Sequence, residues 1–163
     1  MIFLTVGTQL PFDRLVRALD DWAGARGRGD LFGQIAEPGP GGYRPRNFPF
    51  AANLPPAEFQ QRCREAALIV AHAGMGSLIT AMTFGKPILV MPRRGALGEH
   101  RNDHQFATAR ELGSRPGVAV ALDAAELGQK LDAMLAEGNV GGAGLPPFAE
   151  PQLIAAVRRA ILG

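Results

Sequence analysis

The chain has 163 residues, 47% of them hydrophobic, which is enough for one domain with a substantial core. Its 17 basic and 15 acidic side chains give a formal net charge of +2, too small an excess to indicate a nucleic-acid-binding surface. The single cysteine, Cys63, excludes an internal disulfide and, with only 3 histidines, argues against a structural zinc site. We therefore expect a reducing, cytoplasmic setting, and neither a secretion signal nor a run of the ~18 apolar residues that span a membrane is recognisable.

The first part of the sequence alternates between β-rich runs and helical patterns. Short apolar runs predict strands at residues 2–7, 31–39 and 48–52. Apolar residues at helical spacing predict helices at residues 11–23 and 55–67, the second of which opens on proline. The segment PGPGGYRPRN, which precedes the third strand, is so rich in glycine and proline that we expect it to be mobile or held by a ligand.

The second part continues the same alternation. Apolar runs predict strands at residues 67–74, 86–92 and 117–122, and helical spacing predicts helices at residues 76–85, 103–113, 123–137 and 150–162. Gly85 and Gly113 mark helix ends, and Asp123 is a predicted helix cap. Strands that alternate with helices predict an α/β fold, namely a Rossmann-like, doubly wound parallel sheet. The glycine-rich breaks are too short to be domain linkers, so we expect residues 1–163 to form a single domain.

The motif HAGMGS follows the fourth predicted strand. In an open parallel sheet, ligands bind beyond the carboxyl ends of the strands, where loops and helix amino termini expose backbone N–H groups. There, Gly74 and Gly76 would let the backbone approach a diphosphate, and Ser77 could cap the helix and donate its hydroxyl. The alternative is that both glycines only serve a tight turn, with His72 hydrogen-bonded at the strand edge. A lone G-x-G does not decide between these interpretations.

The turn after the first strand, VGTQ, is a second candidate for the same crevice. Gly7 permits a close backbone approach, and Thr8 offers a hydroxyl and an amide. Neither G-x-G-x-x-G nor G-x-x-x-x-G-K-[ST] occurs in the sequence, which disfavours a dinucleotide-dependent oxidoreductase and a P-loop enzyme.

The loop after the fifth strand is the third candidate. Arg93 and Arg94 follow the strand directly, and we expect them to point at the ligand crevice, the alternative being a solvated pair. Further along, short polar side chains that suit a hydroxyl-rich ligand gather at Glu99, His100, Asn102, Asp103, His104 and Gln105. The two histidines are spaced i, i+4, but the H-E-x-x-H glutamate and a third ligand are missing, so no metal site is expected. The alternative for this loop is a solvated helix entry.

Taken together, LTVGT, HAGMGS, GKPILVMP and NDHQFATA, in this order and spacing, resemble the carboxyl-terminal domain of family 28 glycosyltransferases. The resemblance covers roughly residues 1 to 136. Its layout is most similar to short, stand-alone members, namely the catalytic subunit of the UDP-N-acetylglucosamine transferase of dolichol-linked oligosaccharide synthesis and bacterial exopolysaccharide transferase subunits.

The resemblance implies the carboxyl-terminal, donor-binding half of a GT-B glycosyltransferase. Such a subunit would move a sugar from a UDP-sugar to a lipid-linked saccharide acceptor with inversion, in polysaccharide synthesis and without a metal cofactor. The acceptor-binding half would be a separate, membrane-associated subunit that recruits this cytoplasmic chain to the inner face of the membrane and is needed for activity. The alternative is a non-catalytic, nucleotide-binding regulatory subunit.

The resemblance also implies donor-binding positions. They are Gly7, Thr8, His72, Gly74, Met75, Gly76, Ser77, Glu99, Asn102, His104 and Gln105. The uracil would lie near residues 50–53. The family usually carries a glutamate that grips the ribose hydroxyls on the helix after HAGxGS, whereas this sequence has Thr80, and Glu99 is our candidate substitute.

The catalytic groups stay open at the level of sequence. The departing diphosphate needs positive charge, which helix amino termini and an arginine supply, and Arg93 and Arg94 are the candidates. A general base must deprotonate the acceptor, and the partner subunit is the expected source, although His104 is also a candidate. The arginines could pair with the carboxylate of a glucuronic acid donor, while N-acetylglucosamine and glucose remain alternatives.

Overall fold

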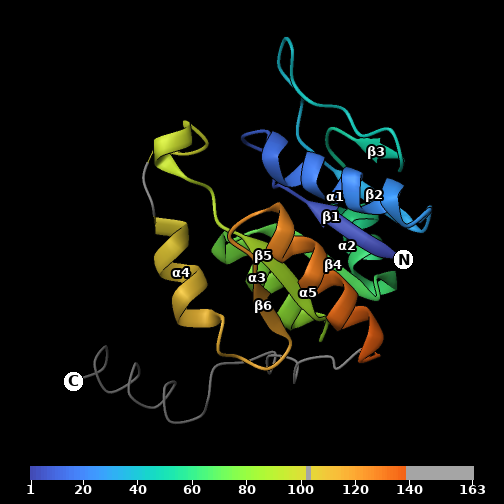
Figure 1. The fold of residues 1–163 in the computed structure, drawn as a ribbon, viewed down its shortest axis with the longest axis vertical. Helices are drawn as coiled ribbons and strands as arrows, with labels where there is room; N and C mark the ends of the chain where they lie inside the picture. Colours follow the sequence, from blue (N-terminus) through green and yellow to red (C-terminus); the bar gives the residue numbers. More distant parts are fainter. Residues whose placement is uncertain (102–103, 139–163) are drawn as a thin grey trace, which may run out of the picture.

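The fold is a parallel β-sheet between two layers of helices, seen in a computed structural model that describes residues 1–101 and 104–138 (Figure 1). The six strands of the described part are β1 Ile2–Thr5, β2 Leu31–Gln34, β3 Phe50–Ala51, β4 Leu68–His72, β5 Ile88–Met91 and β6 Val118–Val120. The helices are α1 Asp13–Ala25, α2 Pro56–Glu65, α3 Met75–Thr83, α4 His104–Leu112 and α5 Ala124–Ala136, with a 3-10 turn η1 at Gly95–Leu97. The predicted Rossmann-like fold is confirmed, and the helix predicted at 150–162 lies outside the described residues.

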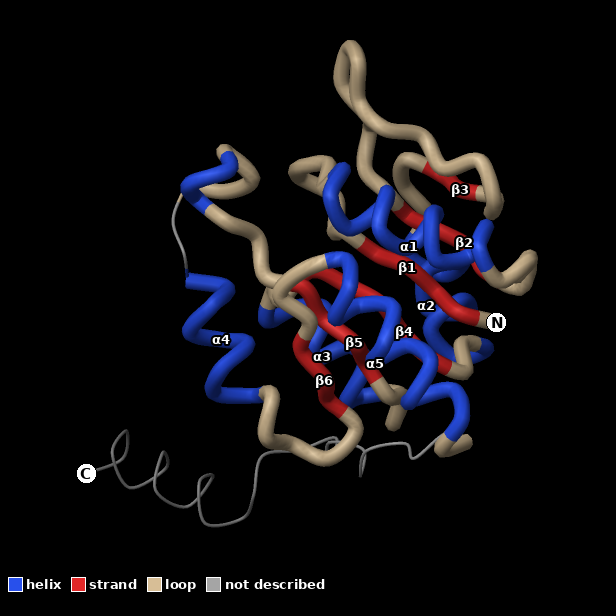
Figure 2. Tube along the Cα trace, in the orientation of Figure 1, coloured by secondary structure: helices blue, strands red, loops and turns tan. Residues whose placement is uncertain are grey.

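The strand order is β3-β2-β1-β4-β5-β6, and all pairs are parallel. Helices α1 and α5 cover one face of the sheet, in front of the strands in Figure 2, and α2, α3 and α4 cover the other. Successive side chains of a strand point to opposite faces, so Ile2 and Leu4 join the core under α1 and α5, while Phe3 joins the core under α2 and α3. Burial on both faces explains why the strands read as continuous apolar runs.

The strand order reverses direction at β1. The chain moves from β1 to β2 on one side and later returns to place β4 on the other side, with Thr5 paired to both Gln34 and Ala71. The loops that follow β1 and β4 therefore leave the same edge of the sheet side by side. This is the topological switch point at which open α/β sheets bind ligands.

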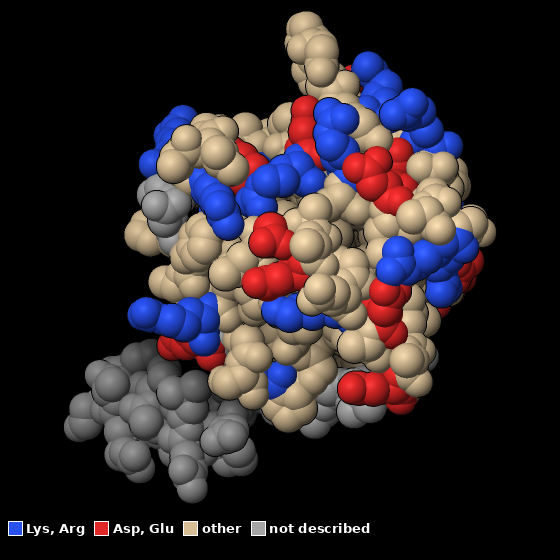
Figure 3. All heavy atoms as spheres, in the orientation of Figure 1, with Lys and Arg blue, Asp and Glu red and all other residues tan. Residues whose placement is uncertain are grey.

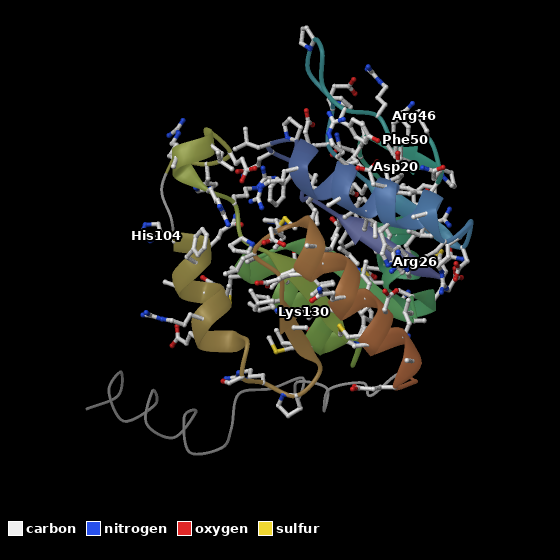
Figure 4. All side chains as sticks on the ribbon, in the orientation of Figure 1. Asp20, Arg26, Arg46, Phe50, His104 and Lys130 are labelled. Atoms are coloured by element: carbon white, nitrogen blue, oxygen red, sulfur yellow. The ribbon has the colours of Figure 1, made fainter. Side chains whose placement is uncertain are left out.

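The glycine- and proline-rich segment before β3 is held by the protein itself. Asp20 of α1 is 1% exposed and accepts hydrogen bonds from the Tyr43 hydroxyl (2.7 Å) and from the backbone N–H groups of Arg46 (3.0 Å) and Asn47 (2.8 Å). Figure 4 shows Asp20 and Arg46 side by side. Burial raises the pKa of Asp20, but these hydrogen bonds outweigh burial and hold the pKa below its usual range. A buried carboxylate of α1 thus holds residues 43–47, the second half of this segment, without a ligand.

Two features of the surface bear on function. The face seen in Figure 3 carries basic and acidic side chains interspersed, without a basic stripe. In residues 1–101 and 104–138, no helix is both long enough and apolar enough to cross a membrane.

Candidate functional site

A pocket of about 770 Å³ opens at the switch point, a size suited to a small-molecule ligand. Its walls come from the turn after β1, the end of β2, the start of α2, the end of β4, the exposed side of α3 and the loop after β5. The predicted donor-binding residues that line it are Gly7, Thr8, His72, Gly76, Ser77 and Gln105. Hence two separate glycine turns and one side chain of α4 converge as predicted.

The imidazole of His72 explains two of the glycines. A Cβ on Gly74 would lie 2.4 Å from Nε2 of His72, closer than any side chain tolerates, and a Cβ on Gly7 would lie 3.2 Å from Cε1 of the same ring. Gly7 also has φ +81°, a left-handed conformation that favours glycine. A Cβ on Gly76 would meet nothing within 4 Å. Gly74 therefore makes room for a histidine, and of the two glycines in HAGMGS only Gly76 faces open space in the pocket.

His72 is held in its neutral form. Burial, and then the positive charge of Arg93, lower its pKa to about 4, against a smaller opposing effect of a hydrogen bond with the Thr5 backbone. The Ser77 hydroxyl lies 3.4 Å from Nδ1 of this ring. The prediction that Ser77 caps α3 is wrong. The cap position is Gly74, and Ser77 lies within the first turn of the helix.

The amino terminus of α3 supplies the anion-binding character of the pocket. The first backbone hydrogen bond of the helix runs from Leu78 N to Gly74 O (3.3 Å), so the N–H groups of Met75, Gly76 and Ser77 precede it. Such N–H groups and the helix dipole favour negative charge. The Met75 side chain itself is 51% exposed and lies outside the pocket lining, so only its backbone has a place in the predicted role.

Arg93 holds the first turn in place. It is 2% exposed, and its guanidinium donates to the carbonyl oxygens of Pro11 (2.7 Å), Leu10 (2.7 Å) and Val6 (3.1 Å). Burial lowers the pKa of Arg93 to about 10, so it remains a cation at neutral pH. Arg93 thus lines the pocket, as predicted, while its guanidinium braces the turn after β1.

Arg94 lies elsewhere, and the prediction that it points at the crevice is wrong. Its Nη2 donates to the Leu122 carbonyl oxygen at 3.0 Å, and the residue does not line the pocket. The alternative of a solvated arginine pair is wrong as well, because Arg93 is buried and both guanidiniums donate to backbone carbonyls. The two neighbours point in different directions because the chain leaves the sheet in an extended conformation at Arg94.

Glu99 is a structural residue in this protein. Its carboxylate accepts from Nε of Arg14 (2.7 Å) and from the backbone N–H of Arg94 (2.8 Å). Burial raises the pKa of Glu99, but these two donors outweigh burial and lower the pKa overall. Since its oxygens are occupied and it lies outside the pocket lining, the prediction that Glu99 replaces the missing ribose-binding glutamate is wrong.

The remaining predicted residues of this loop have different outcomes. Gln105 is 8% exposed, lines the pocket, and accepts from the backbone N–H of Arg93 (3.1 Å). His104 is exposed at the start of α4, on the side away from the sheet, and does not line the pocket (Figure 4). Asn102 lies outside the described residues.

Sequence reasoning missed several lining residues. They include Thr5, Leu10, Gln34, Leu54, Pro56, Phe59, Gln60, Ile79, Thr83 and Phe84. Gln34 carried a recognisable signal, because a buried glutamine at the carboxyl end of an apolar strand needs partners; its Oε1 accepts from Leu54 N at 3.1 Å. Residues 50–53, expected beside the uracil, do not line the pocket, and Leu54 and α2 do so instead.

His100, one of the polar residues predicted in the loop after β5, lines this pocket. Its Nδ1 is buried and has no hydrogen-bond partner among the residues that the structure describes. In the same part of the chain, no cluster of three or more histidine, cysteine or acidic side chains could hold a metal ion.

Comparisons with known proteins agree with this architecture. The solution structure of ALG13 superimposes with a TM-score of 0.58 at 18% identity, covering 99% of this chain and 96% of that one. MurG of Acinetobacter baumannii superimposes with a TM-score of 0.59 at 20% identity, covering 82% of this chain but 40% of MurG. The glycosyltransferase VinC, in complex with dTDP, gives 0.51 at 19% identity and covers 83% of this chain and 33% of VinC.

This chain therefore spans less than half the length of MurG and VinC, and nearly the whole length of ALG13. The sequence pattern of the glycosyltransferase family 28 C-terminal domain matches residues 1–142, most of the chain. With the parallel sheet, the two glycine turns and the pocket between them, this match shows that the chain belongs to the C-terminal domain family of glycosyltransferases 28.

Proposed function

We propose that this chain is the donor-binding catalytic subunit of an inverting glycosyltransferase and that its pocket holds a UDP-sugar. The observation that carries the proposal is the meeting of the α3 amino terminus with the turn after β1 at the switch point. There the N–H groups of Gly76 and Ser77, with the open space above Gly76, fit a diphosphate. The same N–H groups and the α3 dipole would stabilise the departing UDP without a metal ion.

The two ends of the pocket differ in chemistry, and this orients the proposed donor. On the α2 and α3 side the walls include Leu54, Phe59 and Phe84, which suit the flat face of a base. On the other side, the lining includes His100 and Gln105, whose polar side chains suit sugar hydroxyls. The nucleoside would thus lie along α3 and the sugar towards the loop after β5.

The acceptor side of the reaction is proposed to come from another protein. The chain covers 96% of ALG13, 40% of MurG and 33% of VinC, and the resemblance to family 28 implies that the acceptor-binding half is a separate protein. Of the two histidines that line the pocket among the described residues, His72 is buried and has a pKa of about 4, which makes it a weak base at neutral pH. We therefore assign the general base to a membrane-associated partner subunit, which presents a lipid-linked saccharide in polysaccharide synthesis and recruits this cytoplasmic chain to the inner face of the membrane.

The identity of the sugar stays undecided between glucuronic acid, N-acetylglucosamine and glucose. Arg93 and Arg94 no longer favour glucuronic acid, because both guanidiniums already donate to backbone carbonyls. A direct comparison of the three UDP-sugars in the reconstituted pair would identify the donor.

Calorimetric titration with UDP, the UDP-sugars and NAD tests the proposed site. We expect UDP to bind and NAD to give no signal, and Gly76→Asp to abolish UDP binding because it places a carboxylate at the proposed phosphate position. Gly29→Asp is the matched control, since a Cβ at Gly29 also meets nothing within 4 Å and the residue is exposed away from the pocket. Binding of NAD with no response to UDP would contradict the proposal.

Activity is tested with the partner present. We expect no sugar transfer by this chain alone and transfer from a UDP-sugar to a lipid-linked saccharide once the acceptor-binding subunit is added. A chain that binds UDP-sugar and yields no transfer with its partner would instead be the regulatory subunit.

A further inference from the structure

The ribose of a bound nucleotide has a defined place along α3, if the pocket binds UDP as proposed above. With the diphosphate at Gly76, the nucleoside extends towards the base-binding walls at Phe59 and Phe84. Thr80 lies four residues, or about 6 Å of helix rise, beyond Gly76, and Thr83 follows on the same side. Both threonines line the pocket between the phosphate and base positions. The ribose therefore lies beside the threonine face of α3.

This face offers little to a pair of ribose hydroxyls. The Thr80 hydroxyl donates to the Gly76 carbonyl oxygen and the Thr83 hydroxyl to the Ile79 carbonyl oxygen, both at 2.8 Å. These protons stay within the helix, so each hydroxyl retains only weak, neutral acceptor capacity. Neither threonine loses its own hydrogen bond when the bound nucleotide lacks a ribose hydroxyl.

The other polar side chains near the base-binding end are neutral amides whose oxygens are already hydrogen-bonded. The Oε1 of Gln34 accepts from Leu54 N at 3.1 Å, and the Oε1 of Gln60 accepts from Nη2 of Arg64 at 3.2 Å. Among the residues that the structure describes, no aspartate or glutamate lines this pocket. Glu99, the acidic residue that the sequence offered for the ribose, lies outside the pocket lining and is paired with Arg14.

A binding site rejects a ligand that lacks a hydroxyl when that ligand leaves a buried polar group of the site unpaired. A carboxylate beside the ribose is the usual device in nucleotide sites. From the carboxylate-free threonine face we infer that this pocket does not distinguish ribose from 2′-deoxyribose. Deoxynucleoside diphosphates and their sugars are therefore ligands of the same site.

Calorimetry with the full chain, using UDP and 2′-deoxy-UDP as probes, tests the inference. We expect the two dissociation constants to agree within about fivefold, the range of one neutral hydrogen bond. A preference of UDP above about twentyfold would overturn the inference while leaving the proposed UDP site intact. Absence of binding by both nucleotides would overturn the proposed function and the inference with it.

A variant pair tests the assigned position of the ribose. Thr80→Glu is expected to create a preference for UDP over 2′-deoxy-UDP of about 10- to 100-fold, because its carboxylate accepts a charge-assisted hydrogen bond. Thr80→Gln has the same shape without the charge and should give a smaller preference. Repulsion between the new carboxylate and the diphosphate affects both nucleotides alike, so the ratio is the measured quantity. Folded Thr80→Glu protein with an unchanged ratio would overturn the placement of the ribose beside Thr80.

Discussion

The two glycine turns that form the pocket are built in different ways. The turn after β4 is shaped mainly by its own residues, because Gly74 makes room for His72 and Gly76 opens α3 towards the pocket. The turn after β1 takes its shape from elsewhere, since the Arg93 guanidinium donates to the carbonyl oxygens of Val6, Leu10 and Pro11, which lie 82 to 87 residues away in sequence. Local sequence therefore suffices to describe one turn, and the other depends on a distant residue.

The site combines glycines that serve packing with a glycine that serves a ligand. Gly7 and Gly74 leave room for the His72 ring, and this packing needs no ligand. Gly76 has no neighbour to accommodate, so its lack of a side chain matters only when something enters the pocket. Variants that change stability should thus be separable from variants that change ligand affinity.

The largest expected effect follows from removing the distant brace. Arg93→Met leaves three carbonyl oxygens of the first turn without their donor, and we expect the free energy of unfolding to fall by about 2–4 kcal/mol. Urea unfolding measures this change. Arg94→Met, the control at the neighbouring position, should cost under about 1 kcal/mol because it loses one exposed hydrogen bond and a distant contact with the Phe106 ring. Equal losses in both variants would contradict the assigned brace.

The second prediction concerns the pH dependence due to His72. Its pKa falls from 6.5 to about 4 on folding, so the unfolded chain binds more protons between these values. Stability therefore falls as pH falls, by up to about 3 kcal/mol between pH 6.5 and pH 4. The neighbours that disfavour its charged form are Arg93 and His100. His72→Gln does not titrate, and subtracting its urea-unfolding profile from that of the wild type should isolate the effect; identical slopes would refute it.

Two alanine substitutions should change the free energy of unfolding in opposite directions. Gly74→Ala forces the His72 ring to move and should destabilise by about 1–3 kcal/mol. Gly76→Ala meets no neighbour and should stabilise the first turn of α3 by up to about 1 kcal/mol, because alanine is the better helix former. If Gly76 serves the diphosphate, the same variant loses UDP affinity in calorimetry. Gain of stability without loss of affinity would remove Gly76 from the proposed site.

The smallest effect is expected at Ser77. Its hydroxyl makes only a 3.4 Å contact with His72, so Ser77→Ala should change the free energy of unfolding by less than about 0.5 kcal/mol. UDP affinity should nevertheless fall several-fold if the hydroxyl donates to a phosphate. An unfolding loss similar to that of Gly74→Ala would show that Ser77 supports the turn.

Much of the fold was predictable because its signals are local. The strand β4, the glycines that follow it and the helix α3 occupy one continuous stretch, and a strand buried on both faces reads as an uninterrupted apolar run. The Asp123 cap was also predictable, and its Oδ1 accepts from Glu126 N at 2.9 Å. Since parallel strands share a carboxyl edge, Gly7 and Gly76 could be placed in one crevice without coordinates.

Several of the errors concern charged side chains that have more than one geometrically acceptable partner. Glu99 lies in a polar loop, and nothing in that loop shows that Arg14 of α1 will pair with it. Asp20 reads as one more acidic residue of an amphipathic helix, yet it orders the backbone at Arg46 and Asn47. Long side chains reach any of several neighbours, so their partners are set by how the elements pack.

The Rossmann-like architecture, the family and the edge of the sheet that carries the pocket could be inferred from the sequence, because hydrophobic periodicity, glycine turns and the alternation of strands with helices are properties of contiguous residues. The packing of the elements set the strand order, the contacts of Arg93 with the first turn, the pairing of Glu99 with Arg14 and the hydrogen bond from Thr80 to Gly76. Hydrogen bonds depend on distances of a few tenths of an ångström between groups far apart in the chain, and packing alone fixes those distances.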